Sequence, residues 1–371
     1  MRVGIFADLP SASTGFAVVC SNIARELADY YDLEIYYFGR YGRKQGFARK
    51  AIFTEDGYYY VPCVGGVWDY NYLNKLIKKW KIETMFSEDD WFSSQGLISA
   101  SRKNKIPLHF YTPIDCLPLP EEAFKKLNKC SKVYTPNSSY KILRKRNINA
   151  FYLPHGVDLP KFFPFKKEKK ATFVWMGRNE ERKNLLAFIH ALHHLIKKEK
   201  KKDVKAIIRT DWIVPTVLRV FTDRIIRRLD LEKNIIKEQT KDISHEQMRN
   251  FYNNGEVYVN TSCAGGFELG IIEANACGLP AVVTNWRFMN ENVLDGVNGW
   301  LVNVEKIYKN PFIGNGKWGK INVEDLSKTL LFIVENLDSI RKMALQCRMF
   351  VSQRYSWKKT AKLLYTHLTK E

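Results

Sequence analysis

The sequence predicts an α/β protein built from two doubly wound domains. Short runs of β-prone, apolar residues at 3–7, 172–176 and 257–260 are each followed by a turn and then by apolar residues at helical spacing. The first of these runs opens the chain, and strand, turn and helix in that order are typical of a doubly wound sheet. At 371 residues, 45% of them hydrophobic, the chain is long enough to form two cores.

The stretch 257–284 organises the second half of the chain. Val257–Asn260 predicts a strand, Gly265 and Gly266 predict a tight turn, and the helix predicted over Leu269–Ala276 ends at Gly278. The first turn of such a helix presents unpaired backbone N–H groups and a positive dipole end. This arrangement suits an anionic group.

Glu273 is the lone carboxylate on this otherwise apolar helix. A buried carboxylate is costly unless another group donates a hydrogen bond to it. The residues alone leave two partners open, a ligand hydroxyl and a structural cap.

The first turn, Ser13 to Gly15, is the corresponding feature of the N-terminal half. Its backbone amides could cradle a phosphate, and the alternative is an ordinary turn between strand and helix. The turn has no G-x-G-x-x-G pattern, so the sequence gives no support for NAD binding.

Carboxylates follow the strand predicted at 84–87. Glu88, Asp89 and Asp90 are site candidates, because the carboxyl ends of strands line the crevice of an open α/β sheet. The alternative is a cluster that caps the next helix. A divalent metal site is possible in principle at these residues.

Composition limits the environment and the partners. The formal net charge is +20, and two lysine runs, 166–170 and 197–203, are either solvated or attracted to anionic lipid or nucleic acid. The seven cysteines form no CxxC pair, which indicates reduced thiols in a cytoplasmic protein. No signal peptide or transmembrane helix is expected from the hydropathy pattern.

Residues 265–280 resemble the donor-site signature of retaining GT-B glycosyltransferases, most closely the glycosyltransferase group 1 or GT4 type. That family carries two glutamates separated by seven residues, and the second contacts the nucleotide ribose. Glu273 stands at the second position, whereas the first, which helps to hold the sugar ring in the family, is Gly265 here. The departure leaves the donor sugar open. Glu268 stands where the family often has a glycine, near the diphosphate.

Residues 177–184 provide a second match. The family carries a Gly-Arg pair and a later lysine after this strand, which correspond to Arg178 and Lys183, and the resemblance implies that both contact the donor diphosphate. The chemistry agrees, since a leaving diphosphate gains negative charge that fixed cations stabilise. Arg182 is a lesser candidate. A solvated basic turn is the alternative.

The resemblance implies a GT-B fold, two Rossmann-like domains facing across a cleft. The expected division is 1–160, 161–345, and a helix at 346–371 that crosses back to the N-terminal domain. Asp115, Arg178 and Lys183 are the expected catalytic residues, and His155, Asp89 and Asp90 are expected at the cleft, with no metal and no cofactor. The expected donor-binding residues are Gly15, Arg178, Lys183, Gly265, Gly266, Phe267, Glu268, Leu269, Gly270 and Glu273.

The expected activity is that of a metal-independent, retaining hexosyltransferase that uses a nucleoside diphosphate sugar. The acceptor is a glycan, lipid or protein, and peripheral contact with an anionic inner membrane face is compatible with the basic charge; nucleic acid is not the expected partner. Two alternatives stay open: a GT-B-fold sugar-nucleotide epimerase or hydrolase, and a degenerate, non-catalytic basic binding protein.

Overall fold

The computed structural model describes residues 1–12, 14–30, 32–40, 51–63, 70–165, 172–212, 217–240, 243–312 and 314–369. The chain forms two compact units. The N-terminal domain comprises Met1–Ile114, Leu119–Gly156 and Tyr355–Glu371, and the C-terminal domain comprises Asp115–Pro118 and Val157–Arg354. Ser13 and the lysine run 166–170 lie outside the described residues.

The N-terminal domain is built on an eight-stranded sheet in the order β3-β4-β2-β1-β5-β6-β7-β8, in which only the β3–β4 pair is antiparallel. Its elements are β1 (Arg2–Asp8), α1 (Gly15–Ala28), β2 (Glu34–Arg40), β3 (Ile52–Phe53), β4 (Tyr59–Pro62), α2 (Tyr70–Trp80), β5 (Thr84–Glu88), α3 (Gln95–Asn104), β6 (Leu108–Tyr111), α4 (Glu121–Leu127), β7 (Lys132–Thr135), α5 (Tyr140–Lys145), β8 (Ala150–Tyr152) and α13 (Trp357–Thr369).

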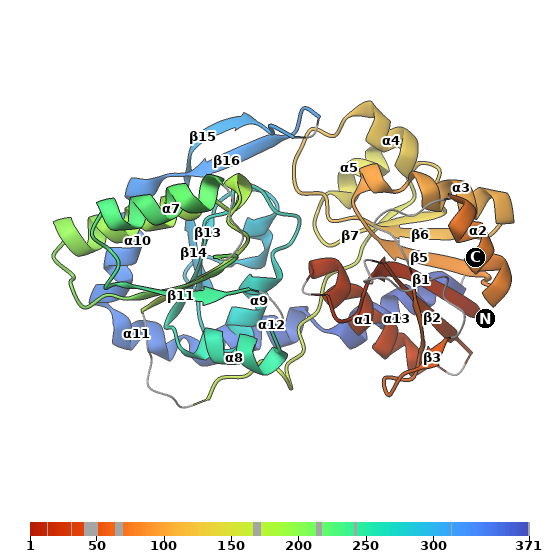
Figure 1. The fold of residues 1–371 in the computed structure, drawn as a ribbon, viewed down its shortest axis with the longest axis horizontal. Coiled ribbons are helices and arrows are strands. Elements are labelled where there is room, and N and C mark those ends of the chain that lie inside the picture. The colour runs from red at the N-terminus through yellow and green to blue at the C-terminus, as the bar shows by residue number, and fades with distance from the viewer. Residues whose placement is uncertain are drawn as a thin grey trace. The chain divides into compact units, whose positions relative to one another are not determined.

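Helices cover both faces of this sheet. The first helix, α1, packs against the last, α13, on one face, while α2 and α3 lie side by side on the other (Figure 1). The strands of the sheet centre are almost fully buried, as expected for a parallel sheet covered on both sides. The carboxyl ends of β1 and β5 are neighbours at the point where the strand order reverses.

The C-terminal domain is built on a six-stranded parallel sheet in the order β11-β10-β9-β12-β13-β14, with a separate antiparallel hairpin, β15–β16. Its elements are β9 (Phe173–Met176), α6 (Leu185–His193), β10 (Ala206–Thr210), α7 (Val217–Arg228), β11 (Ile235–Gln239), α8 (His245–Asn253), β12 (Val257–Asn260), α9 (Leu269–Ala276), β13 (Ala281–Thr284), β14 (Gly299–Val302), β15 (Val304–Lys309), β16 (Lys317–Ile321), α10 (Val323–Glu335), α11 (Leu337–Lys342) and α12 (Ala344–Arg354).

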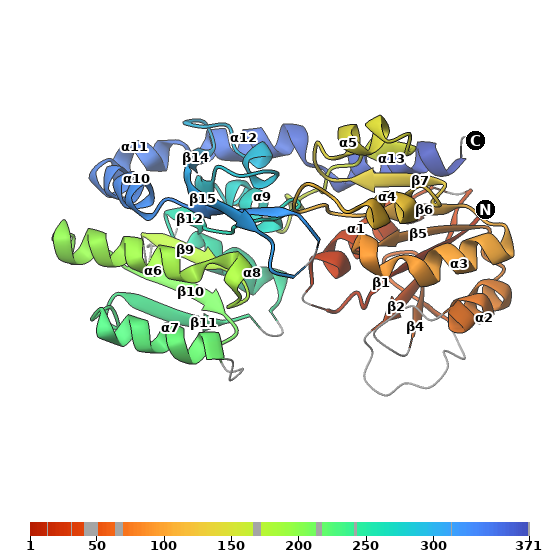
Figure 2. The ribbon, with the colours of Figure 1, turned by 90° about the horizontal axis from the view of Figure 1, so that it is seen from above.

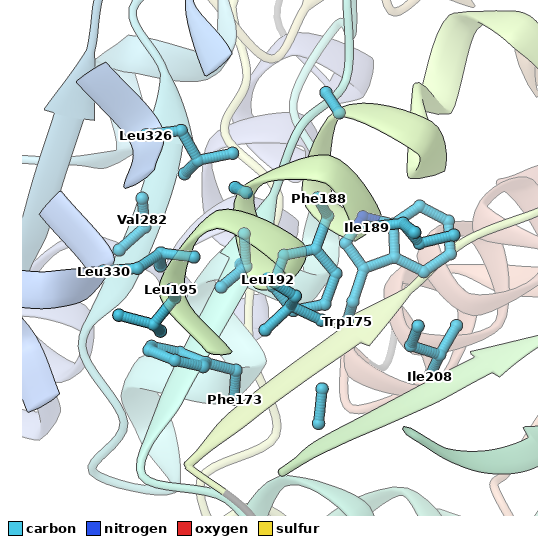
Figure 3. Packing of buried hydrophobic residues seen from close by; sticks show 14 of the residues in the cluster. Phe173, Trp175, Phe188, Ile189, Leu192, Leu195, Ile208, Val282, Leu326 and Leu330 are labelled. Carbon is cyan, nitrogen blue, oxygen red and sulfur yellow. The ribbon is translucent and has the colours of Figure 1, made fainter. Parts of the chain in front are cut away.

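One face of this sheet carries the main core of the domain. Phe173 and Trp175 of β9 pack against Phe188 and Leu192 of α6, and Leu330 of α10 closes the cluster (Figure 3). Each such side chain contributes roughly 1.5–3 kcal/mol when it is fully removed from water. The core therefore fixes β9, the strand that leads into the loop 177–184.

Helices α8 and α9, which lie before and after β12, have well-defined ends. Ser244 and Gln247 form a capping box at the start of α8. The turn after α9 is confirmed at Gly278, which has a φ of +81°. The hairpin β15–β16 and the helices α4, α7, α10 and α11 have no counterpart in the sequence prediction, and the helix predicted at 346–371 is divided into α12 and α13 (Figure 2).

Both predicted domain boundaries shift. The first falls at Gly156 instead of residue 160, and the second at Arg354 instead of residue 345. The second shift has a clear cause, because α12 packs on α9 within the C-terminal domain. Arg348 of α12 also donates hydrogen bonds to the carbonyls of Phe162 and Ala276, at 2.7 and 2.6 Å.

Candidate functional site

Two loops of the C-terminal domain leave its sheet at the same place. β9 and β12 are parallel neighbours, but the chain continues from β9 to β10 on one side and from β12 to β13 on the other. The loops 177–184 and 261–268 therefore start side by side at the carboxyl edge, where the strand order reverses. Open α/β sheets bind ligands at such a point.

Hydrogen bonds tie the two loops together. The Cys263 N–H donates to the Arg182 carbonyl at 2.7 Å, and Arg182 Nη1 donates to the Ala264 carbonyl at 2.8 Å. The Thr261 hydroxyl donates to the carbonyl of Lys183 at 3.1 Å. These bonds fix the backbone of Arg182 and Lys183 against the loop that precedes α9.

A charged cluster forms where the loops meet. Lys183 Nζ donates to both carboxylate oxygens of Glu268, each at 2.7 Å, and the Asn260 amide donates to Oε2 at 3.2 Å. Arg182 Nη1 lies 3.6 Å from Oε1. Only 15% of the Lys183 side chain and 10% of the Glu268 side chain are exposed. The cluster is therefore a largely dehydrated anion–cation site.

Burial and charge act against each other in this cluster. Burial lowers the pKa of Lys183, and Glu268 offsets only part of that effect. For Glu268, burial disfavours the carboxylate, but the charges of Lys183 and Arg182 hold its pKa below the ordinary value. Arg182 is also desolvated, yet Glu268, Glu180 and Asp115 raise its pKa. Each partner thus favours the charged form of the other, against the effect of burial.

The loop before α9 has an unusual backbone at Glu268. This residue has a φ of +64°, a left-handed conformation that costs a residue with a side chain roughly 1–2 kcal/mol. Gly265 has no such φ; it is needed because a Cβ there would lie 2.8 Å from Glu268 Cγ. The glycine therefore leaves room for the returning Glu268 side chain.

Other members of the loop are also held in place. The Asn292 side chain donates to the carbonyl of Phe267, and the Phe288 N–H donates to the carbonyl of Gly265 at 3.3 Å. A Cβ at Gly270 would lie 2.6 Å from the Tyr258 hydroxyl. Leu269 is the first residue of α9. Gly265 and Gly270 thus leave room for neighbouring side chains within the protein.

Glu273 lies one turn further along α9. The Tyr252 hydroxyl donates to Glu273 Oε2 at 2.8 Å. Burial raises the pKa of Glu273 to about 7, although the bond from Tyr252 acts in the opposite direction. The structure therefore provides a structural partner for Glu273, the Tyr252 hydroxyl, which is one of the two alternatives that the sequence left open. The Glu273 residue is partly exposed.

Neither Arg178 nor Asp115 is part of the charged cluster that contains Lys183. Arg178 is exposed at the start of the loop after β9. Asp115 belongs to the C-terminal domain, whereas the prediction placed it in the N-terminal one. The reason is a long-range contact: the carbonyl of Leu117 accepts from the Lys317 N–H of β16 at 2.9 Å, so the hairpin holds the 115–118 segment.

The loops after β9 and β12 lie within the part of the chain that a protein-family model matches. A family model described as Glycosyl transferases group 1 matches residues 170–310. This region is similar to group 1 glycosyltransferases. It contains Arg178, Lys183, Glu268 and Glu273, so the resemblance stated from these motifs is confirmed. A search of curated proteins gave no match.

Solved glycosyltransferases share the fold over the whole chain. Sucrose-phosphate synthase from Thermosynechococcus elongatus is 15% identical, with a TM-score of 0.79 over 99% of this chain and 98% of that one. A glycosyltransferase from Rickettsia africae is 14% identical, with a TM-score of 0.76 over 100% and 99%. Anabaena HepE, in complex with UDP and glucose, is 14% identical, with a TM-score of 0.74 over 100% and 99%. The predicted GT-B fold is thus confirmed.

In the N-terminal domain, Gly15 begins α1. Thr14 caps the helix by accepting from the Ala17 N–H at 3.1 Å, and its hydroxyl donates to Asp8 at 2.7 Å. Asp8 also accepts from Arg40 Nε at 2.9 Å. Gly15 itself is exposed, next to this capped and charged edge of the sheet.

Asp89 does not lie in an open crevice, which corrects the expectation from the sequence. It is 2% exposed and pairs with Arg40 Nη1 at 2.6 Å, so Arg40 bridges Asp8 and Asp89 inside the domain. Asp90 is partly exposed and precedes a short 3₁₀ turn without a side-chain capping bond. The carboxylates after β5 are therefore partly structural.

His155 is likewise buried in the N-terminal domain, contrary to the expectation of a cleft position. It is 4% exposed, and its Nδ1 lies 2.8 Å from the Tyr111 hydroxyl, which donates to the carbonyl of Leu153 at 2.6 Å. Burial lowers the pKa of His155 to about 3. Its Nε2 lies 3.9 Å from Glu88, whose pKa burial raises well above the usual range. Burial thus disfavours the charged form of both groups.

Sequence reasoning missed Asn260 in the charged cluster and Tyr252 beside Glu273. Asn260 at the end of β12 and Tyr252 on α8 carry no motif, and Arg182 ranked below Arg178. The sequence signal that could have found Asn260 is its position, because it ends a strand next to the point where the strand order reverses. Among the described residues, no three His, Cys, Asp or Glu side chains are grouped to hold a metal ion, and no helix is long and apolar enough to cross a bilayer.

Proposed function

We propose that this glycosyltransferase moves a hexosyl group from a nucleoside diphosphate sugar to an acceptor hydroxyl, with retention of configuration and without a metal ion or cofactor. The observation that supports it best is the convergence of Lys183 and Arg182, from the loop after β9, on Glu268 in the loop after β12. HepE, whose structures hold UDP or UDP-glucose, supports the donor class by analogy.

In this proposal, each charged group has one task. Lys183, with Arg178 at the exposed entrance of the same loop, neutralises the diphosphate. Glu273 accepts hydrogen bonds from the ribose hydroxyls. The backbone of residues 265–270 completes the phosphate cradle. Phe267 and Leu269 belong to the same backbone segment.

The transfer step follows from these tasks. The bond between the anomeric carbon and the diphosphate oxygen breaks, and the acceptor oxygen bonds to the same face of that carbon. The acceptor proton passes to the leaving diphosphate. As the leaving group gains charge, Lys183 stabilises it more strongly than it stabilises the bound donor, which is the requirement for catalysis.

Asp115 remains the proposed polar residue nearest the reaction. Its charge reaches Arg182, as the raised pKa of that arginine indicates. Asp115→Asn should lower kcat and leave the Kd for the nucleotide unchanged. A change in nucleotide Kd of similar size would instead assign Asp115 to donor binding.

The deciding experiment is a thermal-shift panel of UDP, GDP, ADP and their sugars on the wild type and on Glu273→Ala. A ligand at a hundredfold excess over its Kd should stabilise the protein by about 2.7 kcal/mol. One nucleotide should raise the Tm of the wild type and lose this effect in the variant. If no nucleotide raises the Tm of the folded wild type, the proposal is wrong.

Product analysis separates the proposal from its alternatives. Conversion of the donor without any acceptor would indicate an epimerase or hydrolase. Salt-dependent binding to DNA or RNA, in a protein that binds no nucleotide sugar, would indicate a non-catalytic basic binding protein.

The acceptor can be narrowed by charge. The net charge of +20 favours an anionic acceptor or a peripheral position on an anionic membrane. Sedimentation with anionic liposomes should show binding at low salt that is lost at high salt. No binding at low salt would remove the membrane from the proposal.

A further inference from the structure

Lys183 is already neutralised by a group of its own chain. Both oxygens of Glu268 accept hydrogen bonds from Lys183 Nζ at 2.7 Å, so most of the donor capacity of the ammonium is engaged. Arg182 Nη1 lies 3.6 Å from the same carboxylate, and Asn260 donates to it at 3.2 Å. The carboxylate thus occupies a complete anion site.

A diphosphate that binds to Lys183 competes with the Glu268 carboxylate for the same ammonium group. The site is largely dehydrated, and like charges that share a dehydrated cation repel each other more strongly than in water. Sharing Lys183 between Glu268 and a diphosphate is therefore unfavourable. The simplest resolution is that the Glu268 side chain gives up its bonds to Lys183.

The local backbone is built to hold Glu268 in this place. Its left-handed conformation, with a φ of +64°, is one that side-chain-bearing residues rarely adopt. The space for its carboxyl group exists only because residue 265 is a glycine, since a Cβ there would lie 2.8 Å from Glu268 Cγ and 3.0 Å from Cδ. Two unusual positions, a strained glutamate and an enabling glycine, serve one contact.

We propose that Glu268 is an internal competitor of the nucleoside diphosphate for Lys183 and Arg182. Its carboxylate neutralises the two cations while the site is empty and is displaced when the diphosphate binds. The consequence is weaker retention of the nucleoside diphosphate product, which leaves more easily after transfer. This inference rests on the proposed role of Lys183 in diphosphate binding.

The test compares UDP with uridine by isothermal titration calorimetry, or GDP and ADP with their nucleosides if the thermal-shift panel selects another base. Glu268→Gln removes the charge at nearly constant shape, and Glu268→Ala removes the side chain. Each should bind the diphosphate about tenfold more tightly than the wild type, with unchanged affinity for the nucleoside, because only the phosphates compete with the carboxylate. Adding Lys183→Met should abolish the gain.

A second variant reaches the same state by another route. Gly265→Ala places a methyl group where the Glu268 carboxyl lies, and should drive the carboxyl away from Lys183. We expect a similar gain in diphosphate affinity from Gly265→Ala alone, and no further gain in the Glu268→Ala background. Thermal unfolding without ligand verifies that each variant is folded.

The outcomes separate the two levels of inference. If the wild type binds the diphosphate but the Glu268 variants bind it equally or more weakly, Glu268 is not a competitor and only this inference is wrong. If they lose affinity for the nucleotide sugar alone, Glu268 contacts the sugar, which also overturns it. If no variant binds any nucleotide, the proposed function is wrong and this inference falls with it.

Discussion

Glu273 illustrates how one side chain can be both structural and poised for a ligand. It accepts a hydrogen bond from Tyr252 at 2.8 Å, and burial raises its pKa to about 7. Only the ionised carboxylate accepts from a ligand hydroxyl with both oxygens. Its charge state therefore decides whether it can serve as the proposed ribose contact near neutral pH.

This predicts a pH-dependent affinity. Nucleotide binding should strengthen as pH rises from about 6 to about 8, because Glu273 loses its proton in that range. Calorimetry across this range should show the dependence in the wild type and lose it in Glu273→Gln. The stability effect has the opposite sign: a raised carboxyl pKa means that stability decreases as pH rises from about 4.5 through about 7. An equal pH dependence in both proteins would contradict this role.

A second prediction concerns the contribution of Lys183 to the reaction rate. Lys183→Met should lower kcat/KM by about 10²–10³, the range for the loss of one fixed charge that stabilises a leaving group. The matched control is Lys328→Met, since Lys328 pairs with Glu324 on the surface of α10 at 2.7 Å. Steady-state rates with donor and acceptor give the comparison. Equal rates for both variants would exclude Lys183 from the reaction.

At the scale of elements, the α9 segment owes its form to its two ends. It begins after the strained Glu268 and stops at Gly278, where φ is +81°. A Cβ at Gly278 would lie 3.1 Å from Ala344 Cβ of α12, so the stop also allows two helices to approach. The turn thus contributes to the packing that keeps α12 in the C-terminal domain.

A pair of glycine variants separates these two effects. Gly278→Ala and Gly296→Ala both place a side chain at positive φ, +81° and +73°, but nothing lies within 4 Å of a Cβ at Gly296. Gly296→Ala should therefore cost only the backbone strain of roughly 1–2 kcal/mol. Gly278→Ala should cost more, because it also crowds α12. Urea unfolding measures both, and equal costs would show that the approach of α12 is not limiting.

At the scale of the whole molecule, the C-terminal segment completes a domain that the first half of the chain begins. Helix α13 packs on α1, and Gly156 lies so close to Trp357 that a Cβ there would be 2.7 Å from Trp357 Cγ. The Thr360 hydroxyl donates to the carbonyl of Pro154 at 2.8 Å. The N-terminal domain therefore cannot reach its final form until the last residues are present.

Neighbouring leucines on α13 test this dependence. Leu364 is fully buried, so Leu364→Ala should destabilise the N-terminal domain by about 2–5 kcal/mol. Leu363 is 37% exposed, and Leu363→Ala should cost much less, within about 1 kcal/mol. Hydrogen exchange resolved by segment should place the larger loss in strands of residues 1–156. Losses confined to α13 would show that the helix is only an appendage.

The sequence by itself determined the local and periodic features. Strands β9 and β12, helix α9 with its stop at Gly278, and the capping box of α8 follow from residue patterns that act over a few positions. The glycosyltransferase motifs were visible for the same reason. Such features depend on backbone preference and side-chain alternation, which neighbouring residues settle among themselves.

Only the tertiary structure decided which distant groups meet. Lys183 and Glu268 are 85 residues apart, and they form an ion pair because β9 and β12 are neighbours in the sheet. The same kind of long-range contact moved Asp115 to the C-terminal domain, buried His155 against Tyr111, and set the boundary at Arg354. Burial and charge pairing depend on strand order and on which helices cover each face. No local pattern carries that information.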